Sequence, residues 1–229
     1  MMTFTFNGAR LLADPSGALV WPEGQTLIVS DLHLEKGSAF AERGALLPPY
    51  DTLATLDRLD LALTRHRPRR VICLGDSFHD QRVAERISDH ARLRILTLTR
   101  RHEWIWITGN HDPKPDPIWG GSVKPNLTFD HLVFRHQADS TETHGEVSGH
   151  FHPKARVKLR GRIAAGRCFV CDGTRLLMPA FGAFTGGLEV TAPEIRSLFQ
   201  PVWEIFFLGP TKVYRIKQSL LVTSPRAVP

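Results

Sequence analysis

The sequence predicts a single α/β domain in which a parallel sheet with covering helices is followed by mostly antiparallel β-structure. In the first half, compact apolar segments alternate with amphipathic helical patterns, an order typical of parallel strands joined by helices. After about residue 126 the pattern changes to short strands separated by turns. Polar clusters follow strands in both halves, and a complete site would need the clusters of both. We therefore expect residues 1–229 to form one domain.

The first half begins with alternating residues and turn signals (NG, DPSG) that indicate short antiparallel strands. Residues 48–67 carry leucines at helical spacing, with Asp51 as the expected N-cap, and residues 82–98 have the pattern of a second helix. The Pro- and Gly-rich segment 112–126 is expected to be a loop. The apolar strands expected here are 26–30, 69–76 and 103–112.

The pattern of the second half predicts short strands up to about residue 217. The last segment, 216–229, contains Pro and has no periodicity, so we expect a flexible tail. Cys73, Cys168 and Cys171 are too few for a disulfide framework or a zinc ribbon, and we expect them in buried strands. The strands are expected within 127–137, 145–153, 155–163, 167–173, 174–182, 186–190, 202–209 and 211–217.

The composition is basic, with a formal net charge of +6 over 229 residues and an isoelectric point near 9.6. A basic balance favours phosphate-bearing partners such as nucleic acid, although a genome rich in arginine codons would give the same composition. The N-terminus lacks the pattern of a secretory signal, and no apolar run approaches the roughly 20 residues of a membrane helix. We therefore expect a cytoplasmic protein with no membrane partner.

Polar runs follow three first-half strands and two second-half strands. In open α/β sheets, ligands bind beyond the carboxyl ends of the strands, so we expect these runs to meet in one crevice. A mixed nitrogen and oxygen donor set suits Mn²⁺, Fe²⁺, Zn²⁺ or Co²⁺, and two ions about 3.5–4 Å apart would use all the donors. The candidates are Asp31, His33, Asp76, Asn110, His136, His150 and His152, with His79, Asp80, His111 and Asp112 beside them.

The series D-x-H, GD-x-x-H, GNHD, H and GH-x-H resembles the calcineurin-like metallophosphoesterase superfamily, from residue 26 to about 190. The resemblance implies a four-layer α/β/β/α sandwich with two mixed β-sheets and a two-metal centre at the strand ends. Many members have a glycine after the fourth-motif histidine, whereas this chain has Gln137, so His131 and His144 stay open as alternatives to His136. The implied ligands are Asp31, His33, Asp76 and His152 for one ion, and Asp76, Asn110, His136 and His150 for the other, with Asp76 bridging.

The same resemblance implies a reaction. A hydroxide that bridges the two ions would attack the phosphodiester in line, while the ions hold the nonbridging oxygens. His111 would donate a proton to the leaving oxygen or stabilise the transition state, and Asp112 would either orient His111 or occupy a turn. His79 matches the GDxFH pattern of repair nucleases in this superfamily, in which a second histidine lies near the diester; a structural role is its alternative.

A closer resemblance, carried by SDLHLEKGSAFAERG, LGDSFHD, SGHFHPKARV and LLMPAFGAFTGG, runs nearly end to end. These segments are similar to the ligase-associated DNA damage response metallophosphoesterases, a family described as SbcD-related endonucleases or phosphodiesterases. The resemblance implies a manganese-dependent DNA nuclease that works in repair beside a DNA ligase and a helicase. A phosphodiesterase for small molecules, such as cyclic nucleotides or nucleotide-sugars, and an inert scaffold are the alternatives.

A row of cations follows GHFH at every second position, which in one strand would place them on one face. We expect residues 155, 157, 159 and 163 to face the core. The row could track a nucleic-acid backbone, or it could be a solvated face without a partner. Lys36 and Arg43, after the first motif, are further candidates for phosphate contacts. The cations of the row are Lys154, Arg156, Lys158, Arg160 and Arg162.

Overall fold

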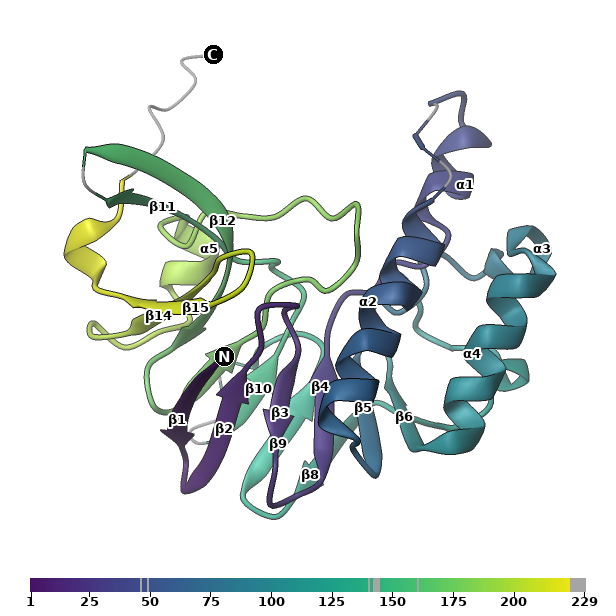
Figure 1. Ribbon diagram of the computed structural model, residues 1–229, viewed down its shortest axis with the longest axis horizontal. Coiled ribbons are helices and arrows are strands. Elements are labelled where there is room, and N and C mark those ends of the chain that lie inside the picture. The colour runs from purple at the N-terminus through teal and green to yellow at the C-terminus, as the bar shows by residue number, and fades with distance from the viewer. Residues whose placement is uncertain (46, 49, 140, 142–144, 160, 223–229) are drawn as a thin grey trace.

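The computed structural model describes every residue except 46, 49, 140, 142–144, 160 and 223–229, and its centre is a pair of β-sheets packed face to face (Figure 1). In the first sheet, the strands from β1 to β4 form an antiparallel meander, and those from β4 to β7 run parallel. These strands are β1 Met2–Phe6, β2 Ala9–Ala13, β3 Leu19–Trp21, β4 Thr26–Val29, β5 Arg70–Leu74, β6 Glu103–Ile107 and β7 Ser122–Lys124.

The second sheet has the order β15-β14-β12-β13-β10-β9-β8, and β11 pairs with β12 beside it. The strands β9, β10 and β13 are parallel, and the other pairs are antiparallel. Both sheets are therefore mixed, as predicted. The strands are β8 Asn126–Phe129, β9 Leu132–Arg135, β10 Glu146–Ser148, β11 Lys154–Leu159, β12 Arg162–Cys171, β13 Arg175–Leu177, β14 Glu204–Leu208 and β15 Val213–Ile216.

Helices cover the outer face of the first sheet (Figure 1). On the second sheet, the helical cover in the described residues is the single turn α5 together with the 3₁₀ turn η2 beside β11, so the fourth layer is thin. Among the described residues, none of the helices has the length and apolar character of a membrane span. The helices are α1 Lys36–Ala41, α2 Asp51–His66, α3 Val83–Arg86, α4 Asp89–Arg101 and α5 Pro193–Arg196, with 3₁₀ turns η1 Pro117–Trp119 and η2 Gln218–Leu220.

Alternation along the strands divides the core. In β5, Val71 and Cys73 pack under the helices, whereas Ile72 and Leu74 point between the sheets. The three cysteines are free and buried, as expected. A third cluster, which includes Trp203, lies on the outer face of the second sheet.

Several boundaries differ from the predictions. The helix expected at 82–98 is broken into α3 and α4 at Ile87, which is extended, and Ser88 caps α4 by accepting from the Ala91 N–H. Asp51 is the first residue of α2, not its N-cap, and its carboxylate accepts from the Gly37 N–H at 2.9 Å. The loop expected at 112–126 contains η1 and β7.

The expected tail is ordered in part. The strand β15 includes Ile216, and η2 follows it. Leu221 forms a bridge with Val157 of β11, and the Val222 N–H donates to the Arg156 carbonyl. Residues 223–229 lie outside the described residues.

Candidate metal centre

The site forms where parallel strands of both sheets end. Asp31 follows β4, Asp76 follows β5 and Asn110 follows β6, while His136 and His150 follow β9 and β10 of the second sheet. Because the carboxyl ends of parallel strands meet at one edge, residues far apart in the chain converge there. Both sheets contribute, which explains why the two halves of the sequence carry complementary motifs.

One cluster consists of Asp31, His33 and His152, whose ligand atoms all lie within 4.8 Å of one another. The Nε2 atom of His152 lies 3.2 Å from Asp31 Oδ1 and 3.3 Å from His33 Nε2. Asp31 is fully buried, and the Ser30 hydroxyl donates to its Oδ2 at 2.6 Å. This geometry directs one carboxylate and two ring nitrogens to a common point.

The second cluster consists of Asp76, His136 and His150. The Nε2 atom of His136 lies 3.4 Å from Asp76 Oδ2, 3.1 Å from His150 Nδ1 and 2.9 Å from Asn110 Oδ1. Asp76 Oδ2 is also 3.9 Å from His33 Nε2 in the first cluster. Asp76 therefore stands between the clusters, where a bridging ligand would have to be.

The structure separates His136 from its alternatives. His136 is held by a hydrogen bond between its Nδ1 and the Leu74 carbonyl, so its Nε2 faces the second cluster. His131 instead lies beside Asp130 and the ring of Trp21. His144 lies outside the described residues.

The backbone at the site is strained. Five of the predicted ligands have positive φ angles, a conformation that costs a non-glycine residue about 1–3 kcal/mol and that clusters at functional sites. Close packing adds a second constraint, because a Cβ on Gly149 would lie 1.8 Å from the Ser30 hydroxyl oxygen. The ligands in this conformation are Asp31, His33, Asp76, His150 and His152.

The electrostatics favour ionised carboxylates. Burial opposes ionisation of Asp31 and Asp76, but hydrogen bonds and nearby charges from histidines prevail and lower both pKa values, that of Asp76 to about 2. Burial lowers the pKa of His33 to about 3. Burial has the same effect on His136, but its hydrogen bond to Asp76 and the two carboxylate charges raise its pKa to about 9. An ion bound at His136 would therefore replace a proton.

These residues fit a pair of divalent ions. The donors are carboxylate oxygens and imidazole nitrogens, the set that borderline first-row ions prefer. Two ring nitrogens 3.3 Å apart, on His33 and His152, face a fully buried carboxylate. The Nδ1 atom of His33 is buried and has no hydrogen-bond partner in the described structure. The polar contacts of this ring are therefore made by Nε2, which faces His152 and Asp76.

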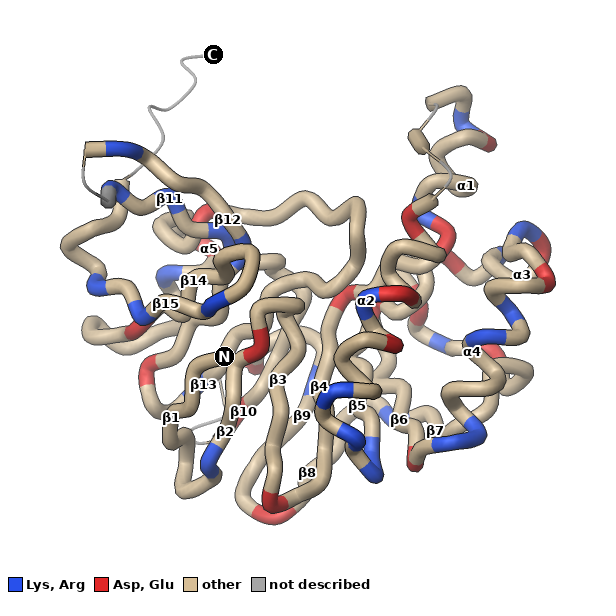
Figure 2. Tube along the Cα trace, in the orientation of Figure 1, with Lys and Arg blue, Asp and Glu red and all other residues tan. Residues whose placement is uncertain are grey.

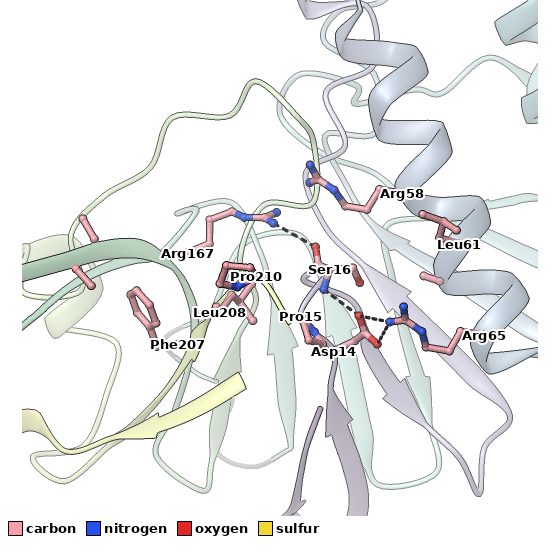
Figure 3. Close-up of a pocket in the computed structure, with 14 residues that line it drawn as sticks. Asp14, Pro15, Ser16, Arg58, Leu61, Arg65, Arg167, Phe207, Leu208 and Pro210 are labelled. Atoms are coloured by element: carbon pink, nitrogen blue, oxygen red, sulfur yellow. Dashed lines mark hydrogen bonds and ion pairs between the residues drawn. The ribbon is translucent and has the colours of Figure 1, made fainter. Parts of the chain in front are cut away.

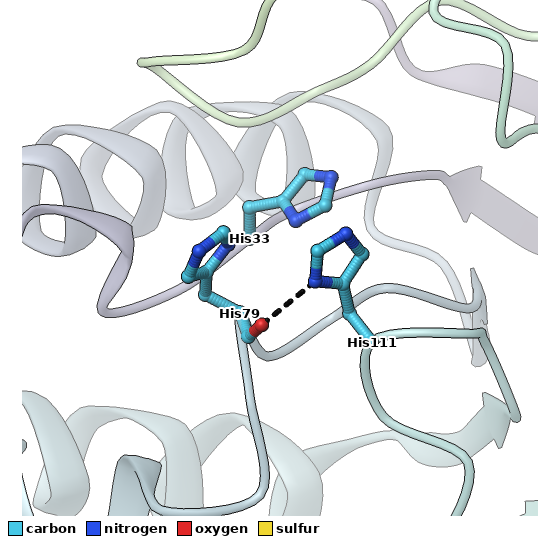
Figure 4. A group of neighbouring side chains, drawn as sticks. All are labelled: His33, His79 and His111. Carbon is cyan, nitrogen blue, oxygen red and sulfur yellow. Dashed lines mark hydrogen bonds between the residues drawn. The ribbon is translucent and has the colours of Figure 1, made fainter. Parts of the chain in front are cut away.

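Three histidines form a further group beside the first cluster (Figure 4). The rings of His79 and His111 stack with centroids 5.0 Å apart, and His33 meets His111 edge-on at 5.0 Å. The Nδ1 atom of His111 lies 2.9 Å from the carbonyl oxygen of His79. Burial first, and then the charges of His111 and Lys36, lower the pKa of His79 to about 4.

Asp112 does not orient His111. Its buried carboxylate accepts hydrogen bonds from the backbone N–H groups of Asp76, Ser77, Phe78 and Gly109. Burial raises the pKa of Asp112 to about 7, although the N–H donors favour its ionised form. Asp112 therefore ties the loop after β6 to the loop after β5, and the His79 carbonyl, which the motif could not reveal, orients His111.

Other contacts were also absent from the sequence argument. Phe40 of α1 lies against the His79 ring, with centroids 5.7 Å apart. Asp80, a further candidate, pairs with Arg86 at 2.7 Å. The sequence suggests Lys36 and Arg43 of this segment as phosphate contacts, but nothing in it indicates that Phe40 contacts His79.

The cationic row is not one strand. Gly161, with φ +79°, turns the chain after β11, so Arg162 belongs to β12 and pairs with position 159. Ile163 is opposite Lys158 and is 53% exposed, so the prediction that it faces the core is wrong. Arg162 lies on the opposite face from Lys158. Position 160 lies outside the described residues.

The remaining cations are held in different ways. The Lys154 ammonium donates to the Thr185 carbonyl at 3.4 Å, and Arg156 lies 4.0 Å from Glu189. Lys158 and Arg43 are exposed, and Lys36 is partly buried. Burial first, and Lys154 among the charges, lower the pKa of Lys36. Figure 2 shows basic residues along the β11–β12 hairpin and both charge signs around α1 and α3.

The fold and this site define a metal-dependent phosphoesterase. Residues 24–170 match the family of calcineurin-like phosphoesterases, and the chain belongs to that family. The match confirms the resemblance that the motifs predicted.

Solved structures give further similarities. The chain resembles the crystal structure of the Pseudomonas putida nuclease MPE, with 27% identity, a TM-score of 0.72, and coverage of 93% of this chain and 99% of that one. It also matches Yfce, a phosphoesterase from E. coli, with 11% identity, a TM-score of 0.41, and coverage of 84% and 98%. No curated protein sequence matches the chain.

Proposed function

We propose that this protein is a two-metal phosphodiesterase that cleaves DNA during repair, with Mn²⁺ as its metal. The observation that carries the proposal is the pair of carboxylate–histidine clusters, joined by Asp76 and flanked by the stacked rings of His79 and His111. Bound ions would lower the pKa of water and draw charge from the phosphoryl oxygens. Partners from the same repair system, a DNA ligase and a helicase, belong to this proposal.

The chain's own contribution to the reaction follows from the contact between His111 and His79. Because a carbonyl oxygen can only accept, Nδ1 of His111 carries a proton, and its Nε2 is free to face a substrate. A doubly protonated ring could donate from Nε2 to the leaving oxygen as the ester bond breaks. Stacking on His79 holds the ring in place during this transfer.

Two observations support DNA as the substrate. The similarity to a bacterial nuclease extends over 93% of the chain. In addition, the charge of Lys154 is among the causes that lower the pKa of Lys36, and the charge of Lys36 is among those that lower the pKa of His79. Cations grouped beside the clusters would attract the phosphates that flank the scissile one.

One observation favours a small diester instead. Lys154 and Arg156 of β11 already have partners within the protein. The cationic row therefore has fewer side chains available for the phosphates of a long DNA strand. We therefore retain hydrolysis of a small phosphodiester as the second candidate.

The test compares Mn²⁺-dependent cleavage of a single-stranded DNA circle with that of bis-p-nitrophenyl phosphate. The double variant Lys36→Ala/Arg43→Ala should lose circle cleavage and retain hydrolysis of the small ester. The control Arg100→Ala/Lys212→Ala removes the same charge at exposed positions of α4 and the β14–β15 turn. Hydrolysis of the small ester without any circle cleavage by wild type would transfer the assignment to small diesters, and inactivity toward both would end the proposal.

A further inference from the structure

A large cleft lined by none of the residues of the two clusters lies between α2, the β2–β3 turn and the strands β12 and β14 (Figure 3). Its volume is about 670 Å³, within the range of small-molecule sites. The β2–β3 turn is at the same edge of the first sheet as Asp31, because β2 runs in the same direction as β4. Nothing in the proposed reaction uses this cleft.

Two arginines in the cleft have no carboxylate partner. Arg58 donates to the Phe181 carbonyl at 2.6 Å, and Arg167 donates to the carbonyls of Ala180 and Ser16. Neither forms an ion pair within the part of the chain that the structure describes. Figure 3 shows their guanidinium groups pointing toward one another. Burial first, and then the charge of Arg58, lower the pKa of Arg167 to about 10.

The other lining residues complete the character of the cleft. Arg65 is neutralised by Asp14, with 3.1 Å between Nη1 and Oδ2, so three arginines and one aspartate leave two net positive charges. Leu61 and Phe207 add apolar surface. Guanidinium groups recognise phosphate oxygens, and an apolar wall suits a base or a sugar.

We propose that this cleft binds the phosphate of a nucleotide through Arg58 and Arg167. The nucleotide is either free or part of a nucleic-acid strand that also reaches the metal centre. The arginines are connected to that centre, because they hold the carbonyls of Ala180 and Phe181 while the N–H groups of Phe181 and Gly182 donate to the carbonyls of Ser30 and Asp31.

The experiment measures binding of dAMP and of a short oligothymidylate to the full chain by isothermal titration, with Mn²⁺ present and with Mn²⁺ chelated. The variants are Arg58→Gln, which removes a proposed contact, and Leu61→Glu, which places a carboxylate on the wall. Leu93→Glu is the matched control, because Leu61 and Leu93 are exposed by 67% and 62% on neighbouring helices and Leu93 lies outside the cleft.

In the chelated protein, both cleft variants should weaken binding by about tenfold or more, and the control should not. Loss for dAMP would identify a free nucleotide as the ligand, and loss for the oligonucleotide only would identify a strand. Equal affinities in all proteins, or equal losses in the control, would overturn the proposal. Hydrolysis of bis-p-nitrophenyl phosphate should persist in Leu61→Glu and in Leu93→Glu, so failure here is distinguishable from failure of the proposed reaction.

Discussion

The contacts of His111 with His79 support a role in proton donation. Its Nδ1 is engaged by the His79 carbonyl and its ring stacks on His79, so replacement by Gln removes a proton donor and leaves the two clusters intact. We expect His111→Gln to lower kcat for bis-p-nitrophenyl phosphate by about 10²–10⁴-fold. Bound manganese, measured by elemental analysis, should stay near the wild-type level. Loss of metal together with activity would assign His111 to metal binding instead.

Asp112 should behave differently, because the hydrogen bonds that its carboxylate accepts within the described residues come from backbone N–H groups. In Asp112→Asn, the amide NH₂ would face N–H donors and leave them unsatisfied. We expect a loss of about 2–3 kcal/mol in the free energy of unfolding, measured with urea. Any remaining folded enzyme should keep the wild-type pH profile, whereas a missing limb in that profile would show that Asp112 takes part in proton transfer.

Residue identities at the site could be read from the sequence, and their partners could not. The motifs supplied both carboxylates and the histidines that the structure brings together. They could not supply the His79 carbonyl or the four N–H groups on Asp112, because backbone groups carry no signature in a sequence. They also could not identify His136 rather than His131 as the ligand. This choice depends on which histidine forms a hydrogen bond with the Leu74 carbonyl, and the structure shows that it is His136.

At the scale of elements, an unrecognised turn explains why the prediction of one cationic strand failed. The run from Lys154 to Ile163 alternates well enough for one strand, but Gly161 adopts a positive φ and reverses the chain. Reversal puts Arg162 and Lys158 on opposite faces and exposes Ile163. Alternation specifies a face only within one strand, so a single turn inside the run changes the interpretation of every later residue.

The turn between β12 and β13 gives a prediction that depends on pH. Asp172 accepts from the N–H groups of Thr174, Arg175 and Gln200. Partial burial opposes its ionisation, but these donors prevail and lower its pKa below the ordinary 3.8. A depressed pKa in the folded state stabilises the protein above the ordinary value, and this stabilisation is lost as the pH falls through the folded value.

We therefore expect Asp172→Asn to cost about 1 kcal/mol near neutral pH, a modest effect because solvent screens a carboxylate that is only partly buried. The difference from wild type should shrink below pH 3.8. Urea titrations at neutral and acidic pH would measure it. A difference that stays constant across this range would show that the charge of Asp172 is irrelevant to the turn.

At the scale of the whole molecule, metal should stabilise the complete fold. The clusters combine residues from both sheets, so an ion that binds them binds only the native state. Manganese at about 100 times its dissociation constant should add about 2.7 kcal/mol to the free energy of unfolding. Thermal unfolding with and without Mn²⁺ would show this as a higher Tm, and His136→Ala should reduce the shift. An unchanged Tm in wild type would argue against metal binding at this site.

The layered architecture was predictable from the resemblance to the metallophosphoesterases, and the parallel part of the first sheet from the alternation of strands with helices. Ile72 and Cys73 are neighbours in β5, yet they belong to different layers of the core. The thin outer layer on the second sheet was not predictable, since Trp203 and its neighbours cover that face from a loop and a single helical turn. Segments that lack periodicity give no signal for the face they cover.

The distance along the chain between residues of the same cluster has a consequence for synthesis. His33 and His152 are 119 residues apart, and each cluster needs a histidine from the second sheet. A nascent chain that has emerged only as far as β7 contains Asp31, His33 and Asp76. It lacks His136, His150 and His152, so neither cluster can form. Metal binding at both clusters would therefore require synthesis past His152, and manganese uptake by ribosome-bound chains of increasing length would show when the site becomes able to bind metal.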